Sequence, residues 1–92
     1  MGRLQGKIAI VTGGARGIGK IYCTEIAKEG AKVVIADILD EEAQQTAAEI
    51  KKNSGTALAL KIDVTSEKNT TYMAEETVRQ FGGIDILINN GC

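Results

Sequence analysis

The sequence contains no proline, no histidine and no tryptophan, and only two cysteines. Cys23 and Cys92 lie far apart and outside any Cys-x-x-Cys spacing, so the sequence predicts neither a metal site nor a disulfide framework. This cysteine usage favours a reducing, cytoplasmic setting. Because cysteine behaves as a small apolar residue, we expect Cys23 to be buried on a helix.

The sequence also has no marked excess of charge of either sign. It holds 11 lysine and arginine residues against 12 aspartate and glutamate residues, with no basic patch, so we expect no binding to nucleic acid. No apolar run is long enough to cross a bilayer, and residues 1–6 lack the apolar core of a signal peptide. With 43% hydrophobic residues over 92 positions, the composition predicts one α/β domain spanning residues 1–92.

A glycine-rich turn follows the first apolar run. Residues 7–11 are rich in β-branched side chains and predict a strand, and residues 12–19 read Thr-Gly-Gly-Ala-Arg-Gly-Ile-Gly. One of the first two glycines suits the positive φ of a sharp reversal, whereas Gly17 and Gly19 let backbone approach a bulky anion. The N–H groups that open the following helix would point at this anion, so we expect a diphosphate. The spacing is Gly-x-x-x-Gly-x-Gly, and the glycines alone also fit a tight turn that binds nothing.

Strand and helix patterns alternate along the whole chain. The expected strands are residues 7–11, 31–36, 57–62 and 84–88. Between them we expect a helix over 18–29 that buries Ile18, Ile21, Tyr22 and Ile26, a helix capped by Asp40 that buries Ala43, Ala47 and Ile50, and a helix capped by Thr65 or Ser66 whose apolar stripe is Ala74, Val78 and Phe81. The order βαβαβαβ with short loops predicts a Rossmann-like, doubly wound parallel sheet with strand order 3-2-1-4. Its ligand crevice would lie above the carboxyl end of the first strand.

Asp37 follows the second strand, about twenty residues beyond the glycine turn. At this place a carboxylate accepts both ribose hydroxyls of an adenosine, and its charge disfavours a 2′-phosphate. We therefore expect NAD rather than NADP. Arg16 is the counter-argument, because its guanidinium can face either the diphosphate or a 2′-phosphate. The simpler alternative for Asp37 is a surface or helix-capping acid.

Polar residues also end the third and fourth strands. Asp63 either accepts from the adenine amino group or caps the next helix, and Val64 either donates its N–H to the ring or packs on it. Asn89 and Asn90 either tie neighbouring strand ends together or reach the cofactor ribose. The candidate cofactor-binding residues are Gly13, Ala15, Arg16, Gly17, Ile18, Gly19, Asp37, Ile38, Asp63, Val64, Asn90 and Gly91.

Three motifs in this order resemble the short-chain dehydrogenase/reductase family. They are residues 12–19, Asp63-Val64, and residues 81–90, which read Phe-Gly-Gly-Ile-Asp-Ile-Leu-Ile-Asn-Asn. The resemblance covers essentially the whole chain and implies a Rossmann fold with a nicotinamide cofactor at the positions named above. It also implies a parent reaction in which hydride transfer interconverts an alcohol and a carbonyl compound. The family pattern continues Asn-Asn-Ala-Gly, whereas this chain reads Asn-Asn-Gly-Cys and stops.

The same resemblance implies that the catalytic serine and the Tyr-x-x-x-Lys pair lie beyond Cys92. Tyr22 and Tyr72 are followed four residues later by Ile26 and Glu76, so neither supplies the pair. We assign no catalytic residue and expect the NAD-binding half of a dehydrogenase, truncated and without hydride chemistry of its own. The alternatives are a fragment of an S-adenosylmethionine-dependent methyltransferase and a non-catalytic nucleotide-binding or assembly module. An open strand edge and an uncovered sheet face predict a homo-oligomer.

Overall fold

A parallel sheet of four strands organises the protein. The computed structural model describes residues 2–90, and its strands are β1 (Ile8–Thr12), β2 (Lys32–Asp37), β3 (Thr56–Lys61) and β4 (Ile86–Asn89). Their order, β3-β2-β1-β4, confirms the predicted order 3-2-1-4. Val11 of β1 lies opposite Ile35 of β2 and Ile88 of β4, so the carboxyl ends of the strands meet at one edge of the sheet.

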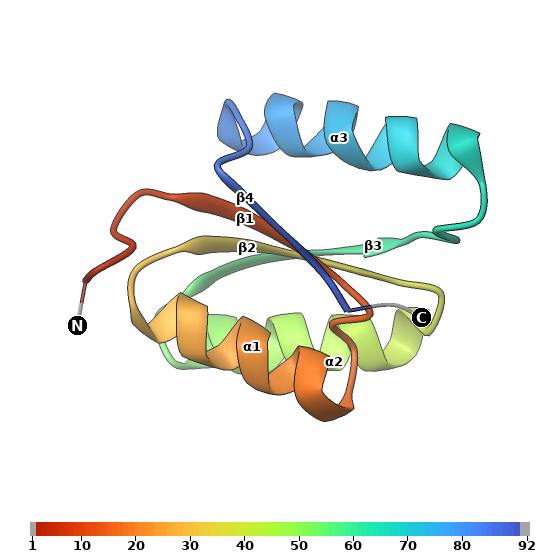
Figure 1. Ribbon diagram of the computed structural model, residues 1–92. Coiled ribbons are helices and arrows are strands. Elements are labelled where there is room, and N and C mark those ends of the chain that lie inside the picture. The colour runs from red at the N-terminus through yellow and green to blue at the C-terminus, as the bar shows by residue number, and fades with distance from the viewer. Residues whose placement is uncertain (1, 91–92) are drawn as a thin grey trace.

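Three helices connect the strands. They are α1 (Gly17–Lys28), α2 (Asp40–Lys52) and α3 (Glu67–Phe81), and every helix and strand begins and ends within two residues of its expected position. Helices α1 and α2 cover one face of the sheet and α3 covers the other (Figure 1). Right-handed crossovers between parallel strands produce this arrangement, which confirms the Rossmann-like, doubly wound fold.

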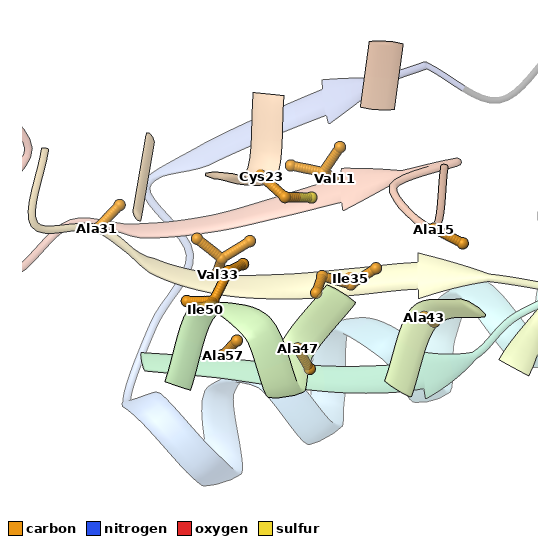
Figure 2. Packing of buried hydrophobic residues seen from close by; sticks show 10 residues of the cluster. All are labelled: Val11, Ala15, Cys23, Ala31, Val33, Ile35, Ala43, Ala47, Ile50 and Ala57. Atoms are coloured by element: carbon orange, nitrogen blue, oxygen red, sulfur yellow. The ribbon is translucent and has the colours of Figure 1, made fainter. Parts of the chain in front are cut away.

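An apolar cluster lies on each face of the sheet. The cluster under α1 and α2 consists of Val11, Ala15, Cys23, Ala31, Val33, Ile35, Ala43, Ala47, Ile50 and Ala57 (Figure 2). The cluster under α3 consists of Ile10, Val34, Ala36, Leu60, Ile62 and Met73. Successive side chains of a strand point to opposite faces, which is why β2 supplies both clusters and reads as a continuous apolar run.

Three of the four apolar residues predicted for the buried face of α1 are exposed, so the prediction is wrong for Ile18, Ile21 and Tyr22. Ile18 and Ile21 are 62% and 58% exposed, and Tyr22 is also exposed rather than part of the core. Ile26 is partly buried and packs against the apolar cluster under α1 and α2, as predicted. The buried residues of α1 are Gly19 and Cys23, which confirms the prediction for the cysteine. These two side chains are small and let the helix lie close to the sheet, which leaves the larger residues outside.

The start of α2 also differs from the prediction. Asp40 is the first residue of the helix rather than its cap; the cap is Leu39, and no side chain caps this end. Instead, the Leu39 N–H donates to Asp37 Oδ1 at 3.0 Å. An acid placed before the helix therefore replaces the expected cap, while Asp40 remains in the first turn, where its charge is favourable.

Helix α3 confirms one prediction and corrects another. Ser66 is its N-cap and accepts the Asn69 N–H at 3.2 Å, as one of the two expected caps. The fully buried residues are Met73 and Thr77, and Val78 of the predicted stripe is 48% exposed. Phe81 of that stripe is partly buried against the apolar cluster under α3, as predicted. A polar threonine at a buried position is invisible to a search for apolar periodicity, because its hydroxyl is satisfied inside the helix.

Candidate functional site

A cleft of about 310 Å³ opens at the carboxyl ends of β1, β2 and β3. Its lining consists of Gly13, Ala36, Asp37, Ile38, Ile62, Asp63, Val64 and Thr65. The fold thus brings the two acids that follow β2 and β3 together with the first glycine of the turn. Ile38 and Val64 are 54% and 44% exposed, so two apolar side chains are available at the cleft to a flat ring. Ligands of doubly wound sheets bind in such a crevice.

The glycine turn needs its glycines for two different reasons. Gly13 and Gly17 have φ values of 70° and 65°, a left-handed conformation that disfavours a side chain. Gly19 has ordinary φ, but a Cβ there would overlap the carbonyl oxygen of Gly13 and lie 2.8 Å from Asn90 Nδ2. Close approach to the Gly13 backbone therefore explains Gly19, whereas the expected approach to an anion stays a prediction. Close approach does not explain Gly17, whose added Cβ would meet no atom within 4 Å.

The first turn of α1 presents unpaired backbone donors. The helix begins at Gly17 after Arg16, which is extended and provides no side-chain cap. The N–H groups of Gly17, Ile18 and Gly19 have no acceptor within the helix, because the residues four positions earlier lie outside it. Among residues 2–90, the exposed Arg16 guanidinium forms no ion pair. Helix polarity and this cation together favour an anionic ligand.

Asp37 connects the turn to the cleft. Its Oδ2 accepts the Ala15 N–H at 3.0 Å, and its Oδ1 accepts the Leu39 N–H at 3.0 Å. Each carboxylate oxygen has a second lone pair, so the group retains capacity for ligand hydroxyls. The sequence indicated a ligand contact but not this second role, in which Asp37 holds the turn against the start of α2.

Asp63 orders the loop between β3 and α3. Its Oδ1 accepts the Thr65 N–H at 2.9 Å and the Thr65 hydroxyl at 2.6 Å. These bonds, the hydroxyl first, lower the pKa of Asp63 and favour its ionised form. Because Ser66 is the N-cap, Asp63 is not the cap that the sequence offered as one alternative. It instead shapes the turn that brings Val64 to the cleft.

The two asparagines at the end of β4 tie strand ends together through Thr12. The Thr12 hydroxyl donates to Asn89 Oδ1 at 3.0 Å and accepts the Asn90 N–H at 3.2 Å. Asn90 Nδ2 donates to the carbonyl of Gly13 at 3.3 Å, inside the glycine turn. The structure thus contains the first of the two alternatives for these amides. The predicted contact at Gly91 lies outside the described residues.

Two buried side chains that sequence reasoning did not assign to the site also support the turn. Cys23 Sγ donates to the carbonyl of Gly14 at 3.7 Å, and burial raises the pKa of this thiol to about 12. Thr46 of α2, only 1% exposed, donates from its hydroxyl to the carbonyl of Ala15 at 2.9 Å. A threonine between Ala43 and Ala47 on the predicted inner face of α2 is the signal that could have found it.

The described residues can be compared with the requirements for spanning a membrane and for binding a metal ion. No helix within residues 2–90 combines the length and the apolar character needed to span a membrane. In the same part of the chain, no three Cys, Asp or Glu side chains are grouped so that they could hold a metal ion.

Comparison with known proteins gives matches over nearly the whole chain. A family model described as short chain dehydrogenase matches residues 7–92. The 3-alpha-(or 20-beta)-hydroxysteroid dehydrogenase of Mycobacterium tuberculosis is 45% identical over 89 residues, which are 97% of this chain and 33% of that protein. Cyclopentanol dehydrogenase of Comamonas testosteroni is 40% identical over 90 residues, 98% of this chain and 36% of that protein.

Solved structures give the same picture. The hydroxysteroid dehydrogenase of Escherichia coli superimposes with a TM-score of 0.92 at 40% identity, over 95% of this chain and 36% of that one. A 7 alpha-hydroxysteroid dehydrogenase complexed with NADH and 7-oxo glycochenodeoxycholic acid gives 0.91 at 40% identity, over 92% of this chain and 33% of that one. The chain therefore spans about a third of the length of these relatives. These matches do not support the alternative of a methyltransferase fragment.

Proposed function

Because the chain belongs to the short-chain dehydrogenase family, we propose that its glycine turn and the adjoining cleft bind NAD. The chain would be the cofactor-binding part of an enzyme that interconverts an alcohol and a carbonyl compound by hydride transfer. Members of this family bind nicotinamide cofactors, as the NADH complex above illustrates. The observation that carries the proposal is that Asp37, which lines the cleft, accepts the Ala15 N–H of the turn that leads into the unpaired N–H groups of α1.

The diphosphate, the adenosine ribose and the adenine of the cofactor each have a matching group in this arrangement. The N–H groups at the start of α1 and the Arg16 guanidinium suit the diphosphate, since all of them are donors near the positive end of the helix. Asp37 suits the adenosine ribose. Ile38 and Val64, apolar and exposed at the cleft, suit the two sides of the adenine ring.

The preference for NAD over NADP rests on Asp37. A 2′-phosphate on the same ribose would bring negative charge against a half-buried carboxylate that the backbone holds in place. The exposed Arg16 side chain has no ion-pair partner among residues 2–90, and its position suits the diphosphate as well as a 2′-phosphate. We therefore propose NAD as the cofactor, in a reducing, cytoplasmic setting consistent with the buried free thiol of Cys23.

Ligand-dependent melting tests the proposal directly. A ligand that binds only the folded state raises the melting temperature, so millimolar NAD should shift the transition of this chain. NADP should shift it less, and S-adenosylmethionine should leave it unchanged. A cooperative transition that NAD does not move would contradict NAD binding by this chain.

Asp37→Asn tests the basis of cofactor choice. Removing the charge should weaken NAD binding and reduce the ratio of NAD affinity to NADP affinity by about tenfold. A nearby charge commonly shifts a pKa by about one unit, and one pKa unit corresponds to a tenfold change in an equilibrium constant. Asp40→Asn is the matched control, because it removes the same charge three residues later, at the start of α2 and outside the cleft lining. If the two variants had the same ratio of NAD affinity to NADP affinity, the role of Asp37 in cofactor choice would be refuted.

We also propose that the chain self-associates. Within the described residues, β4 pairs only with β1, so its other edge is open, and Leu87 and Ile84 are 60% and 41% exposed beside it. Unpaired edges and apolar patches favour association. Light scattering at tens of micromolar should give at least twice the mass of one chain, and a monomeric mass would contradict the proposal.

A further inference from the structure

Side chains from three different elements hold the two peptide groups that flank Ala15 in the glycine turn. In the first, between Gly14 and Ala15, the carbonyl accepts from Cys23 of α1 and the N–H donates to Asp37 at the end of β2. In the second, between Ala15 and Arg16, the carbonyl accepts the Thr46 hydroxyl at 2.9 Å. Ala15 itself is 2% exposed and packs in the same apolar cluster as Ala43 and Ala47 (Figure 2).

The direction of one peptide group follows from the Thr46 bond. In a trans peptide the C=O and N–H point in opposite directions. Thr46 draws the Ala15 carbonyl inward, toward α2, and therefore turns the Arg16 N–H of the same peptide outward. This donor directly precedes the unpaired N–H groups of α1. The Thr46 bond thus leaves the Arg16 N–H facing away from α2.

Thr46 uses its hydroxyl differently from other threonines in the described helices. The hydroxyls of Thr24 and Thr77 donate to the carbonyl four residues earlier in their own helix, to Lys20 and Met73 respectively. Such bonds satisfy the hydroxyl locally and connect nothing else. The Thr46 hydroxyl instead bonds a residue 31 positions away, in a different structural element. A buried threonine that only filled space in the core could satisfy its hydroxyl within its own helix, as Thr24 and Thr77 do.

We propose that Thr46 is a positioning residue for the cofactor: its hydroxyl holds the Ala15–Arg16 peptide in the orientation that presents the Arg16 N–H to the diphosphate. This inference rests on the proposed binding of NAD and adds a residue of α2 that does not touch the ligand. It also predicts that α2 and the glycine turn act as one unit. Ala43 and Ala47 allow the helix to come close enough for the bond to form.

The test compares NAD affinity in three variants of the full 92-residue chain. Thr46→Val keeps the shape of the side chain and removes the hydroxyl, Thr46→Ser keeps the hydroxyl, and Thr77→Val is the matched control. Thr77 is equally buried, but its hydroxyl bonds within α3 on the opposite face of the sheet. Titration calorimetry well below each melting temperature separates affinity from stability.

We expect Thr46→Val to raise the Kd for NAD about tenfold, the fold-change typical of one lost buried hydrogen bond. Thr46→Ser and Thr77→Val should stay within about twofold of the wild type, since both leave the Ala15 carbonyl paired. A Thr46→Val chain that binds NAD like the wild type would overturn the proposal, and so would a Thr46→Ser chain as weak as Thr46→Val.

A second readout does not depend on NAD. Amide hydrogen exchange at Ala15 reports its bond to Asp37, which should open more often once the carbonyl of the same residue is released. Exchange should be faster in Thr46→Val than in Thr46→Ser or Thr77→Val, and equal rates would overturn the positioning role. If the wild-type chain did not bind NAD, the proposed function would fail, and this comparison would still decide whether Thr46 holds the turn.

Discussion

Among glycine-to-alanine substitutions in the glycine turn, Gly19→Ala should lower the stability of the protein the most. The added Cβ would overlap the carbonyl oxygen of Gly13 and lie 2.8 Å from two further atoms, 0.6 Å inside the 3.4 Å at which ordinary contact begins. The obstacle is backbone rather than a flexible side chain. Gly13 cannot yield easily, because its N–H donates to the Ala36 carbonyl at 2.8 Å and its own carbonyl accepts from Asn90.

The size of the effect follows from two opposing terms. Overpacking of this kind costs about 3 kcal/mol, the upper part of its usual range, because a fixed backbone must move. Alanine in place of glycine within a helix returns about 1 kcal/mol. The net loss of about 2 kcal/mol corresponds to a fall in melting temperature of about 8–16 °C for a domain of this size. NAD affinity should fall as well, since the start of α1 must shift.

Two other glycines separate the causes. Gly17→Ala introduces strain at φ 65° but no contact within 4 Å, and should cost about 1 kcal/mol, or about 4–8 °C. Gly83→Ala meets neither a neighbour nor a positive φ and should stay within about 0.5 kcal/mol of the wild type. Thermal unfolding followed by circular dichroism ranks the three. If Gly19→Ala had the same melting temperature as Gly83→Ala and still bound NAD, the reasoning from close approach would be refuted.

Three further predictions follow from the described contacts. Cys23 should resist alkylation by iodoacetamide at pH 8 until the chain is unfolded in urea, since it is buried and a pKa of about 12 leaves almost no thiolate; peptide mapping distinguishes it from Cys92. Because that pKa is raised from 9.0, the unfolded chain loses this proton first, so the free energy of unfolding should fall as the pH rises from 9 toward 12, and less so in Cys23→Ala. Ser66→Ala should cost about 1 kcal/mol in thermal unfolding and speed hydrogen exchange at Asn69, whose N–H the serine accepts.

The fold could be predicted because it follows from alternation and handedness. Strand and helix patterns in the order βαβαβαβ, joined by short loops, leave few arrangements once crossovers are right-handed. The buried face of α1 could not be read in the same way. Periodicity offered the large residues Ile18, Ile21 and Tyr22 as its inner face, but close packing on β1 and β2 selected Gly19 and Cys23. Distance to the sheet, which no local pattern encodes, decided between the two stripes.

Residues that line the cleft could be predicted, whereas the contacts that hold the neighbouring backbone in place could not. Asp37 and Val64 reach the cleft because they follow buried strands, and strand ends are visible in the sequence. The hydroxyl of Thr12 donates to Asn89, 77 residues away, and that of Thr46 donates to Ala15, 31 residues away. Such pairings exist only once the sheet has formed. The place of Thr46 between Ala43 and Ala47 marks it as buried, but the sequence does not reveal the partner of either threonine.

If the chain binds NAD as proposed, the contacts of Asn90 predict that its affinity depends on how firmly β4 is docked. Asn90 holds both Thr12 and the Gly13 carbonyl, and that carbonyl in turn lies against Gly19 at the start of α1. Within the described residues β4 has a single neighbour in the sheet, so only β1 holds its backbone in register. If β4 undocks for a fraction of the time, the apparent Kd rises by the inverse of the docked fraction. A partner strand on the open edge of β4 would then strengthen NAD binding without touching the cofactor.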